Sequence, residues 1–142
     1  MKRQDVLKKA HSDHRKECEE IWAKNKYLVL SKSQKIYKEI REYLKNDNID
    51  ISHLIEQIDA AKRMKENRGE CVNAFYHIWG YFKKEATTKE KNDFFYLIEA
   101  YLKNEKNKAD IISFIKSLLL KYPNDYIKNS TLMENENNET MA

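Results

Sequence analysis

The sequence predicts an all-α, single-domain protein: a bundle of six to seven helices with a disordered C-terminal tail. Three observations lead to this prediction. The 142 residues include only two glycines and one proline, too few for a turn-rich β fold. Apolar side chains recur at spacings of three and four along six segments, which is the period of an amphipathic helix. A chain of this length fits one domain with one core.

The N-terminal third of the chain predicts two helices. Ser12 is the expected N-cap of a first, long helix, and the second is expected to begin after a cap at Ser31 or Ser33. The polar run at residues 46–48 ends the second helix. The apolar positions are Cys18, Ile21, Trp22, Leu28 and Val29 in the first helix, and Ile36, Tyr37, Ile40, Tyr43 and Leu44 in the second.

The middle of the chain predicts two more helices. Ser52 is expected to open the third helix, and Gly69 to end or bend it. The fourth helix has the most regular period in the sequence, so we expect it at the centre of the bundle. The apolar positions are Leu54, Ile55, Ile58, Ala61 and Met64 in the third helix, and Val72, Phe75, Trp79, Phe82 and Ala86 in the fourth.

The remaining helices have definite start and stop signals. Thr87 and Glu90 form a capping box for the fifth helix. Asn107 is expected to cap a sixth helix that Pro123 stops, because proline has no amide hydrogen and clashes with the preceding turn. Asn124 is expected to cap a short last helix. The apolar positions are Phe94, Leu97, Ile98, Tyr101 and Leu102 in the fifth helix, and Ile111, Ile112, Ile115, Leu118 and Leu119 in the sixth.

The charge of the chain is divided unevenly. Residues 1–129, the predicted helical domain, hold all 27 lysines and arginines and 20 of the 23 acids, so their net charge is +7. Residues 130–142 are rich in Asn and Glu and have too little apolar surface to offset the ordering entropy, so we expect a disordered tail. A basic domain of this size suits a polyanionic partner such as nucleic acid, although lysine-rich surfaces also serve solubility.

The cysteines and the hydropathy indicate the compartment. Cys18 and Cys71 have no zinc-site spacing, and without a signal peptide we expect both to remain thiols in the reducing cytoplasm. No apolar run approaches the roughly 18 residues that span a bilayer, so no membrane partner is expected.

One group of side chains has the spacing of metal ligands. His11, His14 and Cys18 would share one face of a continuous helix. Because the helix is expected to begin at Ser12 and Cys18 lies on the apolar stripe, we expect surface histidines and a buried thiol instead. The sequence has no glycine-rich phosphate loop and no zinc-protease motif, and its carboxylates are scattered among lysines. We therefore expect no enzyme activity, no cofactor and no bound metal.

The fourth predicted helix has a second face opposite its apolar stripe. The face repeats at helical spacing through Asn73, His77, Gly80 and Lys84, and it is flanked by Tyr76, Tyr81 and Lys83. A glycine inside a helix costs about 1 kcal/mol relative to alanine, so we expect another backbone to approach closely at Gly80. That backbone could be a phosphodiester, with Tyr76 or His77 stacked on an unpaired base, or a neighbouring helix.

The run His77-Ile78-Trp79-Gly80-Tyr81-Phe82-Lys83-Lys84 resembles the central motif of the YbgA-like family. The resemblance covers nearly the whole predicted domain, with further matches at Asn25-Lys26-Tyr27, Ser33, Tyr37, Arg68, Asn73, Glu90-Lys91 and Tyr126-Ile127. The sequence departs from the family where Asn25, Lys32 and Cys71 stand in place of histidines. Ser130 stands in place of a glutamine.

This resemblance implies an all-helical domain, often fused behind an iron-sulfur desulfidase-type domain that removes sulfur from thiouracil. The helical part is thought to bind the thiolated tRNA. We therefore expect a non-catalytic RNA-binding module, with tRNA as its ligand, that serves a tRNA thiouridine desulfidase. The expected phosphate contacts are Lys26, Lys32, Arg68, Lys83 and Lys84, and Asn73, Tyr76 and His77 are expected nearer to sugar or base.

Two other functions fit the same residues. The first is a protein-interaction or scaffolding domain, which forms a homodimer through the Gly80 face or docks to a separately encoded enzyme. The second is a small hydrolase or metal-dependent enzyme, which would contain zinc or iron when purified. The chain is expected to be a monomer or a homodimer.

Overall fold

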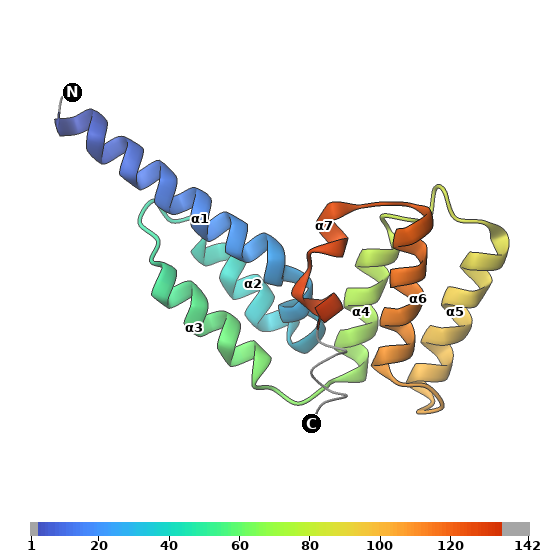
Figure 1. Ribbon diagram of the computed structural model, residues 1–142. Helices are drawn as coiled ribbons and strands as arrows, with labels where there is room; N and C mark the ends of the chain where they lie inside the picture. Colours follow the sequence, from blue (N-terminus) through green and yellow to red (C-terminus); the bar gives the residue numbers. More distant parts are fainter. Residues whose placement is uncertain (1–2, 135–142) are drawn as a thin grey trace.

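The computed structural model describes residues 3–134, with side chains from Ser12 onward, and this part of the chain is helical without a strand (Figure 1). The all-α prediction is therefore confirmed. The helices are α1 (Arg3–Lys32), α2 (Gln34–Tyr43), α3 (Ile51–Lys62), α4 (Arg68–Trp79), α5 (Thr88–Leu102), α6 (Lys108–Lys121) and α7 (Asp125–Lys128), and residues 131–134 are also helical.

Helix α1 is longer than predicted. It continues from Arg3 through Ser12 to Lys32, so the prediction that Ser12 caps it is wrong. Serine is tolerated inside a helix at a small cost, and no glycine or proline interrupts α1. In Figure 1 the N-terminal turns of α1 project beyond α2 and α3.

Side-chain caps define where the other helices begin. The Ser33 hydroxyl accepts the Ile36 amide, which confirms one of the two caps predicted for α2. Helix α3 begins at Ile51, slightly earlier than predicted, because its cap is Asp50 and not Ser52: the Asp50 carboxylate accepts the Ser52 amide. The caps of the last three helices are as predicted: a capping box at Thr87 and Glu90, Asn107 before α6 and Asn124 before α7.

The prediction that Gly69 ends or bends the third helix is wrong. Helix α3 already ends at Lys62, and Gly69 lies in the first turn of α4, which Asn67 caps.

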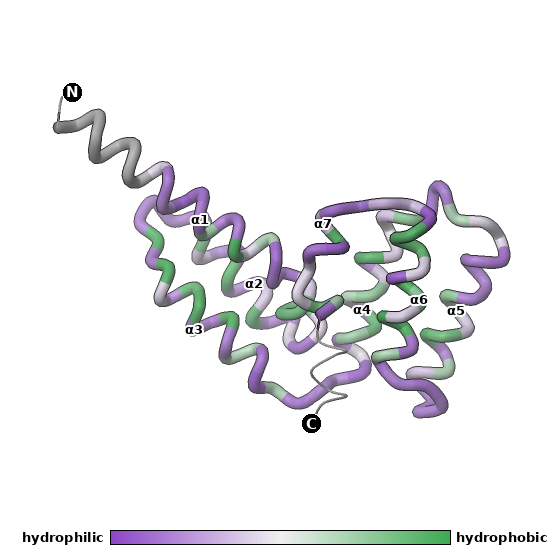
Figure 2. The backbone as a smooth tube through the Cα atoms, in the orientation of Figure 1, coloured by the Kyte–Doolittle hydropathy of each residue, from purple (hydrophilic) through white to green (hydrophobic). Residues whose placement is uncertain are grey.

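The interior contains two apolar clusters, and both include residues of α1. A single core was predicted from the length of the chain. The larger cluster lies between α1, α4, α5 and α6, and the smaller one between α1, α2 and α3. Residues 27–31 of α1 are all buried, so this turn faces both clusters: Leu28 and Leu30 pack into the larger and Val29 into the smaller. Tyr37 packs against both clusters. The alternation of apolar stretches along these helices is visible in Figure 2.

The packed chain extends past the boundary predicted at Ser130. Ser130, Leu132 and Met133 are buried, and the last two belong to the larger cluster. The Thr131 hydroxyl lies 2.9 Å from the Asn25 side-chain oxygen on α1, which attaches this segment to the body. The rest of the predicted disordered tail, residues 135–142, lies outside the described residues.

Candidate nucleic-acid interface

The second face predicted on α4 is exposed. Tyr76 and His77 are exposed and Asn73 is half-buried, whereas the opposite side of the helix faces the larger apolar cluster. The Tyr76 ring packs edge-on against the buried Phe94 ring of α5, with a centroid distance of 5.7 Å, and keeps 43% of its surface exposed. The aromatic side chain is thus held in place and still accessible.

The continuation of this face differs from the prediction, because α4 ends at Trp79 with Gly80 as its C-cap. Beyond Gly80 the chain forms tighter turns, in which the Tyr81 amide donates to the Ile78 carbonyl and the Phe82 amide to the Trp79 carbonyl. Phe82 is still buried in the larger cluster.

Of the two backbones expected to approach Gly80, the neighbouring helix is wrong, and the phosphodiester stays a prediction. Gly80 is exposed, and the atoms nearest to a Cβ placed there are carbonyl oxygens of its own turn, at 3.1 Å for His77 and 3.9 Å for Tyr76. Among the described residues, no atom of a neighbouring helix lies within 4 Å of that Cβ position. A side chain here would require the His77 carbonyl to shift by a few tenths of an ångström.

Lys83 and Lys84 are exposed in the turns that follow α4. Within residues 12–134, neither ammonium has a carboxylate within ion-pair distance. Their charges are therefore not neutralised by the rest of the described chain. They stand at the same end of α4 as His77, and they form with Tyr76, His77 and Asn73 what we call the α4 surface.

Arg68, a predicted phosphate contact, lies away from the α4 surface. Its guanidinium lies 4.4 Å above the Tyr101 ring, donates to the Tyr101 carbonyl, and donates to the Asn104 side-chain oxygen at 2.6 Å. These contacts hold the C-terminal end of α5. Arg68 opens α4 and Lys84 follows its other end, about 18 Å away for a helix of twelve residues.

Lys32 also lies at the Arg68 end of α4. Its ammonium donates to the Met64 carbonyl, just past α3, at 3.0 Å. The adjoining Gln34 amide donates to the Glu70 carboxylate in the first turn of α4 at 3.0 Å. The structure therefore separates Lys32 and Arg68 from Lys83 and Lys84, and the eight predicted contacts do not form one site.

Lys26 is placed near the other end of α4 by its neighbour Tyr27. The Tyr27 and Tyr81 hydroxyl oxygens lie 3.0 Å apart, which connects α1 to the turn that carries Lys83. The Lys26 ammonium lies 5.7 Å from the centroid of the Tyr27 ring. Burial and the positive charge of Arg41 on α2 both lower the pKa of Lys26.

The structure brings together three tyrosines that sequence spacing does not connect. The rings of Tyr27, Tyr81 and Tyr126 form a tyrosine cluster with centroid distances of 6.4, 6.0 and 5.9 Å. Burial is the main reason that the pKa of Tyr27 and that of Tyr126 are raised, so both phenols stay neutral and can donate hydrogen bonds. The sequence held only one indication of this cluster: each of the three tyrosines lies in a segment that resembles the YbgA-like family.

The residues with metal-ligand spacing have other contacts. His14 Nε2 lies 2.9 Å from the Ile49 carbonyl oxygen, and Cys18 is buried in the smaller apolar cluster. The His11 side chain lies outside the described residues. Among the residues that the structure describes, no three His, Cys, Asp or Glu side chains lie close enough to bind one metal ion.

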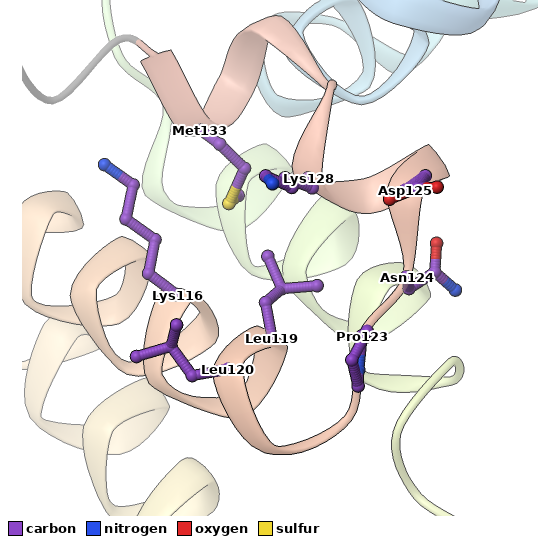
Figure 3. Close-up of a pocket in the computed structure, with 8 residues that line it drawn as sticks. All are labelled: Lys116, Leu119, Leu120, Pro123, Asn124, Asp125, Lys128 and Met133. Atoms are coloured by element: carbon purple, nitrogen blue, oxygen red, sulfur yellow. The ribbon is translucent and has the colours of Figure 1, made fainter.

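A groove of about 450 Å³ lies on a different part of the molecule, between α6 and the segment that contains α7 (Figure 3). Its walls are largely apolar, and Leu120 is 89% exposed there. The lining residues are Lys116, Leu119, Leu120, Pro123, Asn124, Asp125, Lys128 and Met133. None of the predicted contact residues lines this groove.

The fold and the α4 surface define the class: an all-helical domain that presents aromatic and cationic side chains at one end of its central helix. In the described part of the chain, no helix has the length and apolar content needed to cross a bilayer.

The chain belongs to the family described as "Protein of unknown function (DUF1722)", whose model matches residues 26–135. This domain is carried by YbgA-like proteins, so the resemblance seen in the sequence is confirmed. Comparisons with curated proteins and with solved structures gave no match.

Proposed function

We propose that this protein is a non-catalytic RNA-binding module, with tRNA as its ligand, that serves a tRNA thiouridine desulfidase. The observation that carries the proposal is the α4 surface, where exposed Tyr76 and His77 in the last turn of α4 are followed by exposed Lys83 and Lys84 in the turns after it. Proteins that recognise unpaired RNA combine flat side chains, on which bases stack, with cations that bind phosphates. The tRNA and the desulfidase are proposed from the family resemblance.

Each side chain of the α4 surface has a distinct role in this proposal. Lys83 and Lys84 act as point charges for two phosphates and release condensed counterions when RNA binds. Tyr76 and His77 stack on a base that is unpaired in the RNA, and Asn73 donates to a sugar or base oxygen. Because the Tyr76 ring is already held by Phe94, little side-chain entropy is lost on stacking.

The non-catalytic part of the proposal is supported by the burial of both cysteine thiols. Cys18 and Cys71 are fully buried, and burial raises the pKa of each thiol, which disfavours the reactive thiolate.

Lys32 and Arg68 were predicted phosphate contacts. In this proposal they have structural roles instead, because their side chains hold the ends of α3 and α5.

Filter binding of bulk tRNA across a range of salt concentrations tests the proposal. The test variant is Lys83→Glu/Lys84→Glu. A control is Lys103→Glu/Lys106→Glu, which makes the same change of charge at exposed positions at the other end of α5 and also removes the exposed ion pair of Lys103 with Glu99. We expect the test variant to bind at least about tenfold more weakly and to reduce the slope of log affinity against log salt by about two.

The control variant is expected to retain most of the wild-type affinity and slope. Equal losses in both variants would mean that net charge alone drives binding and would contradict the α4 surface as the site. No binding of tRNA by the wild type at low salt would overturn the RNA proposal altogether.

The alternative function is a protein-interaction domain. A helix crossing at Gly80 does not support this alternative, because no described residue of another helix lies close to Gly80. Its remaining support is the apolar groove at Leu120. Size measurement with and without ribonuclease separates the two functions: a dimer that is unaffected by ribonuclease and does not bind tRNA would favour this alternative.

A further inference from the structure

Two cations lie beside the tyrosine cluster, at the meeting point of α1, α2, α7 and the turn after α4. The Lys26 ammonium is 5.7 Å from the Tyr27 ring centroid, and the Arg41 guanidinium carbon is 5.7 Å from the Tyr37 ring centroid. Tyr37 is close enough to Tyr27 to contribute to the rise in that residue's pKa. The two cations are thus held by aromatic rings that belong to one neighbourhood.

Lys26 and Arg41 lack close ion-pair partners in the described part of the chain. After burial, the charge of Arg41 is the other cause that lowers the pKa of Lys26. The Glu42 carboxylate is near enough to Arg41 for their charges to interact, but its ion pair is with Lys45. Within residues 12–134 neither cation has an ion-pair partner. The charges of Lys26 and Arg41 repel one another, and an anion bound between them would offset that repulsion.

The neighbouring hydroxyls supply further donors. The hydroxyl oxygens of Tyr27 and Tyr81 lie 3.0 Å apart, and the Tyr27 hydroxyl also has a hydrogen bond with that of Tyr126. Three hydroxyl hydrogens thus serve two contacts, so one remains available to a ligand. Tyr81 is 45% exposed and can present its hydroxyl to solvent. An arginine fork, an ammonium and a phenol hydroxyl are donors of the kind that phosphate oxygens accept.

We infer that Lys26 and Arg41 bind a phosphate group, assisted by the hydroxyls of the tyrosine cluster. The inference deepens the proposed function and rests on it: this site extends the α4 surface across α1 to α2, so one RNA strand meets both. Lys83 follows Tyr81 by two residues, so the Tyr27–Tyr81 contact links the segments that carry the two groups of cations. The phosphate could come from the RNA backbone or from free phosphate, and two measurements distinguish these sources.

The variant Arg41→Ala is suited to both measurements, because the side chain is exposed and its loss should leave the fold intact. Arg41→Lys keeps the charge, and Lys106→Ala removes one exposed positive charge far from the site. In the first measurement, inorganic phosphate is titrated against thermal unfolding, with chloride at equal ionic strength as the reference. A ligand that binds only the folded state raises the unfolding temperature.

In the second measurement, bulk tRNA binding is followed over a range of salt concentrations. We expect Arg41→Ala to reduce the slope of log affinity against log salt by about one, Arg41→Lys to restore most of it, and Lys106→Ala to leave it unchanged. For free phosphate we expect a stabilisation of the wild type and of Lys106→Ala that Arg41→Ala lacks.

The outcomes separate this inference from the proposed function. Binding of tRNA that depends on Lys83 and Lys84 but not on Arg41, together with no phosphate stabilisation, would overturn the inference alone. Stabilisation by phosphate that requires Arg41, without any tRNA binding, would support a site for free phosphate and overturn the proposed function. An Arg41 effect on tRNA binding alone would support the RNA backbone as the source.

Discussion

The hydroxyl oxygens of Tyr27 and Tyr81 lie 3.0 Å apart, although the two residues are 54 positions apart in the sequence. The contact joins α1 to the turn after α4, two residues before Lys83. Because Tyr27 is only 4% exposed, its hydroxyl depends on protein partners rather than on water. The position of the cationic turn therefore depends on a contact between distant segments.

Replacement of Tyr81 by phenylalanine should destabilise the protein by about 1 kcal/mol, because it leaves the buried Tyr27 hydroxyl without this partner. Urea unfolding of Tyr81→Phe, Tyr27→Phe and the double variant measures the interaction. The double variant should lose less stability than the sum of the single variants. Strictly additive losses would show that the two hydroxyls do not interact.

Replacement of Arg68 should affect stability and not RNA binding. Arg68→Ala removes the stacking on Tyr101 and two charged hydrogen bonds, and we expect a loss of about 2 kcal/mol in the free energy of unfolding. The exposed Lys65→Ala serves as the control, with a change below about 0.5 kcal/mol. The salt slope of tRNA binding should equal that of the wild type in both variants. If the slope fell by about one in Arg68→Ala but not in Lys65→Ala, Arg68 would contact a phosphate of the RNA, and this prediction would be wrong.

Glu90 should make stability depend on acid pH. Its pKa is lowered from 4.5 to about 2, first by the Thr87 backbone amide of the capping box and then by the Tyr122 hydroxyl. The ionised Glu90 carboxylate therefore stabilises the folded protein. This contribution to the free energy of unfolding is fully present above pH 4.5, and it is lost as the pH falls toward 2.

The variant Glu90→Gln isolates this contribution, because glutamine keeps the capping geometry without the charge. Urea unfolding at several pH values between 7 and 3 should show the stability difference between wild type and variant shrinking as the pH falls. A difference that stays constant with pH would contradict the assignment.

The two thiols should be unreactive in the folded protein. Cys18 and Cys71 are 0% and 1% exposed, burial raises the pKa of both, and the Cys71 thiol also donates to the Ser31 carbonyl at 3.4 Å. A disulfide reagent such as DTNB should modify neither thiol in buffer and both in concentrated urea, with glutathione as the standard for a free thiol. Rapid modification of the native protein would contradict the non-catalytic assignment.

The helices and their caps could be predicted because their signals are local. The side chain of Ser33, Asn107 or Asn124 accepts an amide within the next three residues, so the sequence alone contains both partners. The same reasoning failed at Ser12, where propensity favours a cap but the helix continues. It also failed at Gly80, where the apolar spacing continues to Phe82 although the helix has ended.

The site was only partly predictable, because its assembly depends on long-range contacts. The exposed side of α4, with Tyr76 and His77, followed from helical periodicity. The structural role of Arg68 did not, since Tyr101 and Asn104 lie more than 30 positions away. The tyrosine cluster and Arg41 were missed for the same reason: Tyr27, Tyr81 and Tyr126 come from three separate segments.

The central claim is that RNA covers the α4 surface, and lysine footprinting of the wild-type protein tests it most directly. The full chain is acetylated briefly with and without saturating tRNA, and the modified lysines are identified by mass spectrometry. We predict that tRNA protects Lys83, Lys84 and Lys26 and leaves Lys103 and Lys106 as reactive as before. Protection of Lys103 and Lys106 with Lys83 and Lys84 unchanged would contradict the account.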